Sequence, residues 1–211
     1  NPVKATVPFL QSMCMFIYQL NSSFALKNIS CLSLAKDAYF DELAVYYDIR
    51  QRIKYLQKQQ LDSIQDLLNS LDRHVRIVKD SYRSSTKRIQ LFKVHDEKNL
   101  FVSPSDIGFH NTFMSDNTFR FFDFEYAGID SPIKLFLDIC YQPDLNISEN
   151  QMCFIFDQLK DILGFDLENV DHGLRSFFVI KWCLIMLRTM SDFDSQQKIL
   201  AYAQSHGVDI G

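Results

Sequence analysis

The chain has 211 residues, of which 47% are apolar and 23% are charged. This composition excludes a disordered chain and predicts a folded, soluble protein. The cysteines are odd in number and scattered, which disfavours a disulfide framework or a zinc site; they are Cys14, Cys31, Cys140, Cys153 and Cys183. Because free cysteines are typical of a reducing compartment, we expect a cytoplasmic protein.

The net charge of −4 is distributed unevenly. Residues 1–100 carry 15 Lys and Arg against 10 Asp and Glu, whereas residues 101–211 carry 7 against 16. An acidic half disfavours nucleic acid and favours a cationic ligand, although an ordinary solvated surface explains the same imbalance. We see no secretory signal. The most apolar stretch, residues 176–187, is too short to span a bilayer and contains Lys181, so we expect a buried helix and no membrane partner.

The first hundred residues have the apolar spacing of helices, which we expect at residues 7–21, 33–57 and 62–82. In the long second pattern, residues from Ala35 to Leu56, including Leu43, line one apolar face.

The spacing changes after residue 98. Residues 99–103 have strand character, and residues 112–125 predict two short strands around a Ser-Asp-Asn turn. Helices are expected again at 133–141, 149–163, 169–190 and 194–205, with Gly164 at a helix end. Since no linker rich in Gly, Pro or Ser divides the chain, we predict a single domain over residues 1–211, mostly α with a small β-hairpin.

Polar residues gather at the predicted hairpin. Asp106 and Asn111 form a D-x-x-x-x-N pattern, and Asp123 follows twelve residues after Asn111. A hairpin of this length brings its ends together, so Asn111 and Asp123 could ligate one Mg²⁺, with Asp106 as a base beside it. Gly108 would let the loop turn tightly. Taken alone, Asp106 is better explained as a helix or turn cap, and Asn111 and Asp123 could likewise be a turn residue and a strand-end acid; their joint spacing favours a site.

The segments "SPSDIGFHN" and "FRFFDFEYAGIDSP" resemble the catalytic region of the aminoglycoside phosphotransferase and choline kinase group. In this chain the corresponding catalytic loop and metal motif span residues 101–128. The resemblance implies the helical C-terminal lobe of a protein-kinase-like fold, ATP as co-substrate and Mg²⁺ as cofactor. It implies Asp106 as catalytic base and Asn111 and Asp123 as metal ligands. It also implies a small hydroxyl-bearing acceptor, cationic or polyhydroxylated.

Four further residues are candidates for supporting roles. The resemblance implies that Glu125 supports the metal motif and that Asp138 braces the catalytic loop. Ser105 and His110 flank the base and the metal ligand, where they could contact substrate or phosphate. His110 is better explained as a loop residue that faces solvent or a core amide.

The chain departs from the family pattern in two ways. Pro104 and Ser105 stand where the family has His and Gly, and residues 1–107 contain no glycine for a phosphate-covering loop. We therefore expect the N-terminal lobe, with the nucleotide-clamping residues, to be missing in cis, and this chain alone to be inactive. The alternative is a degenerate kinase-like lobe that acts as a non-enzymatic binding module. The sequence indicates neither the acceptor nor an oligomeric state.

Overall fold

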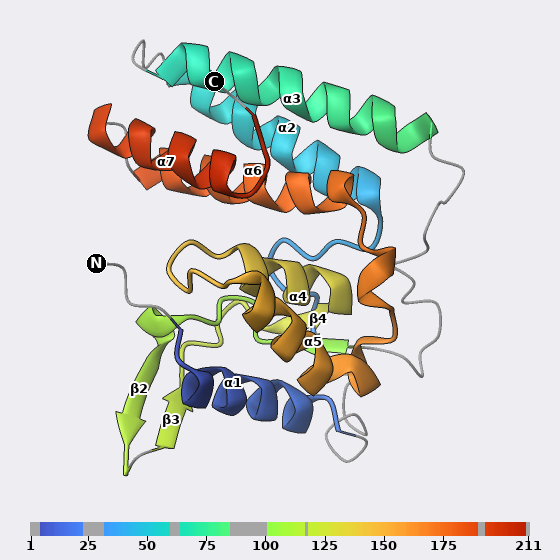
Figure 1. Cartoon of the computed structure of the whole chain (residues 1–211), viewed down its shortest axis with the longest axis vertical. Helices are drawn as coiled ribbons and strands as arrows, with labels where there is room; N and C mark the ends of the chain where they lie inside the picture. Colours follow the sequence, from blue (N-terminus) through green and yellow to red (C-terminus); the bar gives the residue numbers. More distant parts are fainter. Residues whose placement is uncertain are drawn as a thin grey trace. The chain divides into compact units, whose positions relative to one another are not determined.

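The computed structural model describes residues 5–22, 32–59, 64–84, 101–116, 118–189 and 193–209 (Figure 1). Within these residues it contains seven α-helices, two short 3₁₀ helices and two two-stranded antiparallel sheets, so the predicted mostly helical class with a small hairpin is confirmed. The chain divides into two compact units, Asn1–Phe40 with Gln90–Asn169, and Asp41–Ile89 with Val170–Gly211. The single domain stays a prediction.

The first unit combines helices with both small sheets. Its helices are α1 (Val7–Leu20), α4 (Pro132–Tyr141) and α5 (Glu149–Leu163). Its strands are β1 (Phe101–Ser103), β2 (Thr112–Ser115), β3 (Thr118–Phe121) and β4 (Gly128–Asp130). Strands β2 and β3 form the predicted hairpin, whereas β4, which pairs with β1, was not predicted.

One side of β1 is completed by a side chain. The amide of Asn21 donates to the carbonyl oxygen of Val102 over 2.9 Å, and its Oδ1 accepts from the Val102 N–H over 2.7 Å. The same amide donates to Ile17 O over 3.0 Å. Asn21 is 6% exposed, so these bonds are shielded from water and fix the end of α1 against the sheet.

The second unit consists of four helices. These are α2 (Glu42–Lys58), α3 (Gln65–Ser84), α6 (His172–Thr189) and α7 (Phe193–Ser205). Helix α6 packs against the other three, and its Phe178, Val179, Ile180 and Cys183 are fully buried. The expected buried helix is confirmed. In the described part of the chain, no helix has both the length and the apolar character that a bilayer crossing requires.

The predicted helix over 33–57 begins too early. The structure starts α2 at Glu42, where Oδ1 of the preceding Asp41 accepts from Ala44 N over 2.7 Å. Upstream, Ser33 O and Ala35 N bond to the backbone of Ile129 in β4, each over 2.9 Å, so this segment is extended. Leu43, expected on the apolar face, is 44% exposed.

Candidate functional site

The loop that follows β1 begins with a strained turn. Ser105 has φ of 64°, in the left-handed region that favours glycine. Its N–H donates to Ser103 Oγ over 2.9 Å, and the N–H of Asp106 donates to Pro104 O over 2.9 Å. These bonds hold Ser105 in its costly conformation and set the direction in which Asp106 leaves the strand.

Two side chains fix the rest of the loop from within. Asn111 Nδ2 donates to the backbone oxygen of Asp106 over 2.9 Å, and Thr112 Oγ1 donates to Gly108 O over 2.7 Å. Asn111 is 7% exposed, at the end of a 3₁₀ turn, Phe109–Asn111. Gly108 is extended, with φ of −167°, so the expected tight turn at Gly108 is wrong. A Cβ there would lie 2.6 Å from Gln142 Nε2, so a side chain at this position would require the Gln142 side chain to move.

His110 contacts the predicted base. Its Nε2 lies 3.1 Å from Asp106 Oδ1, and its Nδ1 lies 4.0 Å from Asp144 Oδ2. The Asp106 side chain is 39% exposed and that of His110 is 43% exposed. The imidazole therefore engages one carboxylate oxygen of Asp106 and leaves Oδ2 for another partner, while both groups remain accessible to a ligand.

The hairpin brings the two expected metal ligands to the same end. Thr112 pairs with Phe121 across the strands, and the N–H of Phe122 donates to Asn111 O over 3.1 Å. Asn111 thus lies opposite the residue before Asp123. Asp123 is exposed and has φ of 60°, a second non-glycine residue in the left-handed region at this site. Such strain is characteristic of functional positions.

Helix α1 lies against the hairpin (Figure 1), and its aromatic side chains contact hairpin residues. The ring of Phe9, fully buried, lies 4.5 Å from that of Phe109 and 5.4 Å from that of Phe119, centroid to centroid. Two helical turns after Phe9, the ring of Phe16 stacks on those of Phe121 and Phe124, with centroid separations of 5.2 and 5.4 Å. The helix therefore contacts residues on both sides of Asp123.

The supporting residues expected from the resemblance lie in different surroundings. Glu125 is exposed, and the structure gives it no hydrogen bond or ion pair with any described residue. Asp138 lies on α4, where its Oδ2 is 3.2 Å from Lys134 Nζ. Its bracing role for the loop stays a prediction.

Asp138 belongs to a buried charged cluster that was not predicted from the sequence. Lys134 Nζ lies 2.8 Å from Asp130 Oδ2, and Asp130 Oδ1 accepts from the N–H groups of Tyr39 and Ser131 over 3.2 and 2.8 Å. Burial alone would lower the pKa of Lys134, but the two carboxylates outweigh burial and raise the pKa. The spacing of Asp130, Lys134 and Asp138, four residues apart in an apolar run, is the signal that could have revealed this cluster.

The donor set at the end of the hairpin fits magnesium. With its Nδ2 bound to Asp106 O, Asn111 retains Oδ1 as a ligand, and no described residue bonds to Asp123. One amide oxygen and one carboxylate are typical of Mg²⁺ sites that take their remaining ligands from water and substrate phosphates. Across the described ranges, no group of three or more His, Cys, Asp or Glu could hold a metal, which disfavours an all-protein metal cage in that part of the chain.

Comparison of the chain with models of known families, with curated proteins and with solved structures finds no match. The interpretation of the site therefore depends on its own residues and geometry.

Proposed function

We propose that this chain carries the catalytic loop and metal motif of an ATP- and Mg²⁺-dependent phosphotransferase of protein-kinase-like fold, acting on a hydroxyl group of a small molecule. The observation that carries the proposal is the junction of loop and hairpin. Asn111 bonds through its side chain to Asp106 O and through its backbone to Phe122, the neighbour of Asp123. These two hydrogen bonds link the segments that carry the base and the metal ligands, which supports the fixed positioning on which phosphoryl transfer depends.

Asp106 would act on the acceptor. Its Oδ1 is engaged by His110, so Oδ2 accepts the proton of the acceptor hydroxyl as that oxygen attacks the γ-phosphorus of ATP. The bond between the γ-phosphorus and the β–γ bridging oxygen breaks, and ADP leaves with that electron pair. Asn111 Oδ1 and the Asp123 carboxylate would hold Mg²⁺, which neutralises charge on the β- and γ-phosphates when bound.

The strained backbone supports the resemblance on which the proposal draws. The related kinases have glycine at the position of Ser105, and Ser105 has φ of 64°, which glycine adopts without strain. The departure from the family residue therefore leaves the backbone course of the loop compatible with the family pattern. A cationic or polyhydroxylated acceptor and a cytoplasmic location are parts of the same proposal.

The nucleotide clamp is proposed to come from outside these residues. Residues 1–107 contain no glycine, whereas a kinase covers its phosphates with a Gly-rich loop and pairs them with a strand lysine. The coding sequence upstream of Asn1 distinguishes the enzyme from the alternative, a non-enzymatic binding module. A Gly-rich strand–turn–strand followed by a strand lysine supports the enzyme, and a start codon at that point supports the module.

The metal motif can be tested on the chain itself. Mn²⁺, which replaces Mg²⁺ at oxygen sites, should broaden the amide resonances of residues 110–112 and 122–124 in ¹H–¹⁵N spectra. Asp123→Asn should abolish this broadening, whereas Asp161→Asn, which removes an exposed carboxylate on α5, should preserve it. Equal broadening in wild type and Asp123→Asn would contradict the metal assignment.

A further inference from the structure

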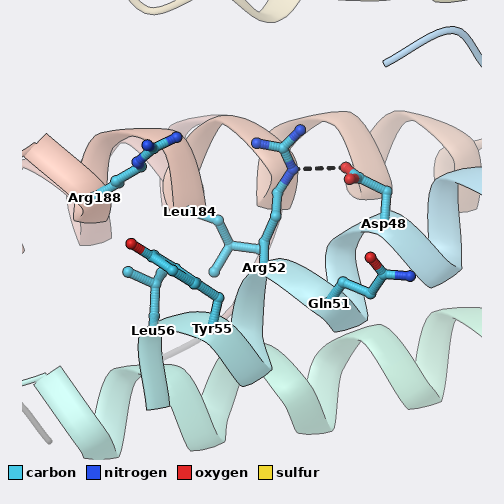
Figure 2. A pocket seen from close by; sticks show the side chains of 7 residues that line it. All are labelled: Asp48, Gln51, Arg52, Tyr55, Leu56, Leu184 and Arg188. Carbon is cyan, nitrogen blue, oxygen red and sulfur yellow. Dashed lines mark hydrogen bonds and ion pairs between the residues drawn. The ribbon is translucent and has the colours of Figure 1, made fainter. Parts of the chain in front are cut away.

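A pocket in the second unit is unrelated to the proposed catalytic motif. It lies between α2 and α6, has a volume of about 300 Å³, and is lined by Gln51, Arg52, Tyr55, Leu184 and Arg188 together with Asp48 and Leu56 (Figure 2). This volume is at the lower end of the range for small-molecule sites. Such a space accommodates a ligand of a few to about ten heavy atoms.

The polar groups of the pocket favour an anion. Figure 2 shows the guanidinium groups of Arg52 and Arg188 on either side of Leu184. Arg52 Nε donates to Asp48 Oδ2 over 2.6 Å, which holds that side chain in place. Arg188 is exposed, and no described residue forms a hydrogen bond or ion pair with it. With two arginines and one aspartate, the lining carries one net positive charge.

The remaining surface favours a flat apolar body. Leu56 and Leu184 are 4% and 2% exposed and form an apolar floor, whereas the Tyr55 ring is 52% exposed and available for stacking. Arginine and tyrosine both stack on planar groups. A single net positive charge matches a monoanion better than a multiply charged phosphate, because Asp48 repels additional negative charge.

We propose that this pocket binds a small aromatic carboxylate, with the carboxylate against Arg188 and the ring over Tyr55 and the leucine floor. The observation that carries the proposal is the exposed guanidinium of Arg188, to which no described residue bonds, in a pocket that also has the exposed Tyr55 and an apolar floor. The inference is independent of the phosphotransferase proposal, because it concerns other residues, another unit and another ligand.

Titration of the full chain with benzoate, followed in ¹H–¹⁵N spectra, tests the proposal. Benzoate should shift the side-chain amide signals of Gln51 and the backbone signals around Leu56. Arg188→Gln should weaken benzoate binding by about tenfold, because one charge-assisted pair is lost. Lys54→Gln, which removes an exposed cation from α2 outside the pocket, should leave the affinity unchanged.

Two further arms define the ligand class. Neutral benzamide and inorganic phosphate should each bind at least about tenfold more weakly than benzoate. Benzamide lacks the negative charge that pairs with arginine, and phosphate lacks the aromatic ring that stacks. Tyr55→Ala should weaken benzoate but not phosphate. Equal benzoate affinity in wild type and Arg188→Gln, benzamide or phosphate binding as tightly as benzoate, or no shift with benzoate at about 20 mM would overturn the proposal.

Discussion

The ammonium group of Lys134 lies 2.8 Å from Oδ2 of Asp130, and the two side chains are 2% and 0% exposed. Asp138, one turn further along α4, lies 3.2 Å from the same ammonium. Because Asp130 also accepts the Tyr39 N–H, the cluster joins the end of β4, the helix α4 and the segment before α2. Three buried charges are tolerated here because each has a partner of opposite sign.

Lys134→Met should therefore destabilise the protein strongly. The substitution removes the ammonium group that both buried carboxylates contact, which costs about 3–5 kcal/mol in the free energy of unfolding. Urea denaturation at pH 7 measures this loss. Lys160→Met, on the exposed side of α5, should change the free energy by less than about 0.5 kcal/mol.

The loss of stability caused by Lys134→Met should be smaller at low pH than at neutral pH. Without the cation, burial raises the folded-state pKa of the carboxylates above the unfolded value, so their destabilising effect is absent at low pH and grows as pH rises. A Lys134→Met protein that is equally unstable at pH 4 and pH 7, relative to wild type, would contradict this account.

The two sheet-proximal glycines should respond differently to alanine. A Cβ at Gly128 would lie 2.4 Å from Ser33 O and 2.6 Å from Ala35 N, and these backbone atoms cannot move without breaking the bonds to Ile129. Gly128→Ala should therefore cost about 1–3 kcal/mol, as overpacking does. At Gly108 the nearest atoms belong to the Gln142 and His110 side chains, which can rotate away. Thermal unfolding that ranks Gly108→Ala as the less stable variant would refute this distinction.

Cysteine reactivity should follow burial. Burial raises the pKa of Cys14 and of Cys183 to about 12, so at pH 8 their thiolate fractions are about a thousandfold below those of an ordinary thiol. Cys153 is exposed on α5. In a Cys31→Ser background, brief iodoacetamide treatment and mass spectrometry should find Cys153 modified and Cys14 and Cys183 protected. Modification of Cys14 in the native protein at a rate similar to that of Cys153 would be incompatible with this packing.

The same two thiols predict a loss of stability in alkali. Their folded pKa of about 12 lies above the ordinary 9.0, so the stability they contribute is complete below pH 9 and declines as pH rises towards 12. At pH 10 each thiol should lower the free energy of unfolding by about 1.4 kcal/mol relative to its value at pH 7. Guanidinium melts across this range should show a shallower decline for Cys14→Ala than for wild type, and an unchanged decline for the exposed Cys153→Ala.

Asn111 is predicted to have separable roles. Asn111→Asp retains an oxygen ligand but loses the N–H donated to Asp106 O, whereas Asn111→Ala loses both. Mn²⁺ broadening at the end of the hairpin should persist in Asn111→Asp and disappear in Asn111→Ala. If the alanine variant retains it, Asn111 is no metal ligand and serves only to hold the loop.

Local signals explain which helix ends could be predicted. Helix α5 begins and ends where expected, because Ser148 and Gln151 form a capping box and Gly164 adopts φ of 69° after the last turn. Residues 33–35, which were predicted as part of α2, are instead extended because of their pairing with the distant Ile129 in β4, which their own pattern does not encode. A three-residue strand such as β4 likewise gives no periodic signal.

The candidate site likewise combines features that follow from local sequence signals with features that depend on tertiary packing. The hairpin and the position of Asn111 beside Phe122 follow from strand alternation and turn residues, which are local. The contact of His110 with Asp106 depends on the 3₁₀ turn, and the Asp130–Lys134 pair depends on burial by surrounding elements. Neither tertiary condition can be obtained from spacing alone.

Asn21 also has a consequence for how molecules of this protein meet in solution. Strand β1 would otherwise present the free N–H and carbonyl of Val102, which could recruit a strand from another copy. A single carboxamide occupies both groups, at 2.7 and 2.9 Å, and so imitates one residue of a third strand. This short edge is thereby closed to intermolecular β-pairing, a protection against aggregation that larger sheets obtain with an additional strand or a covering helix.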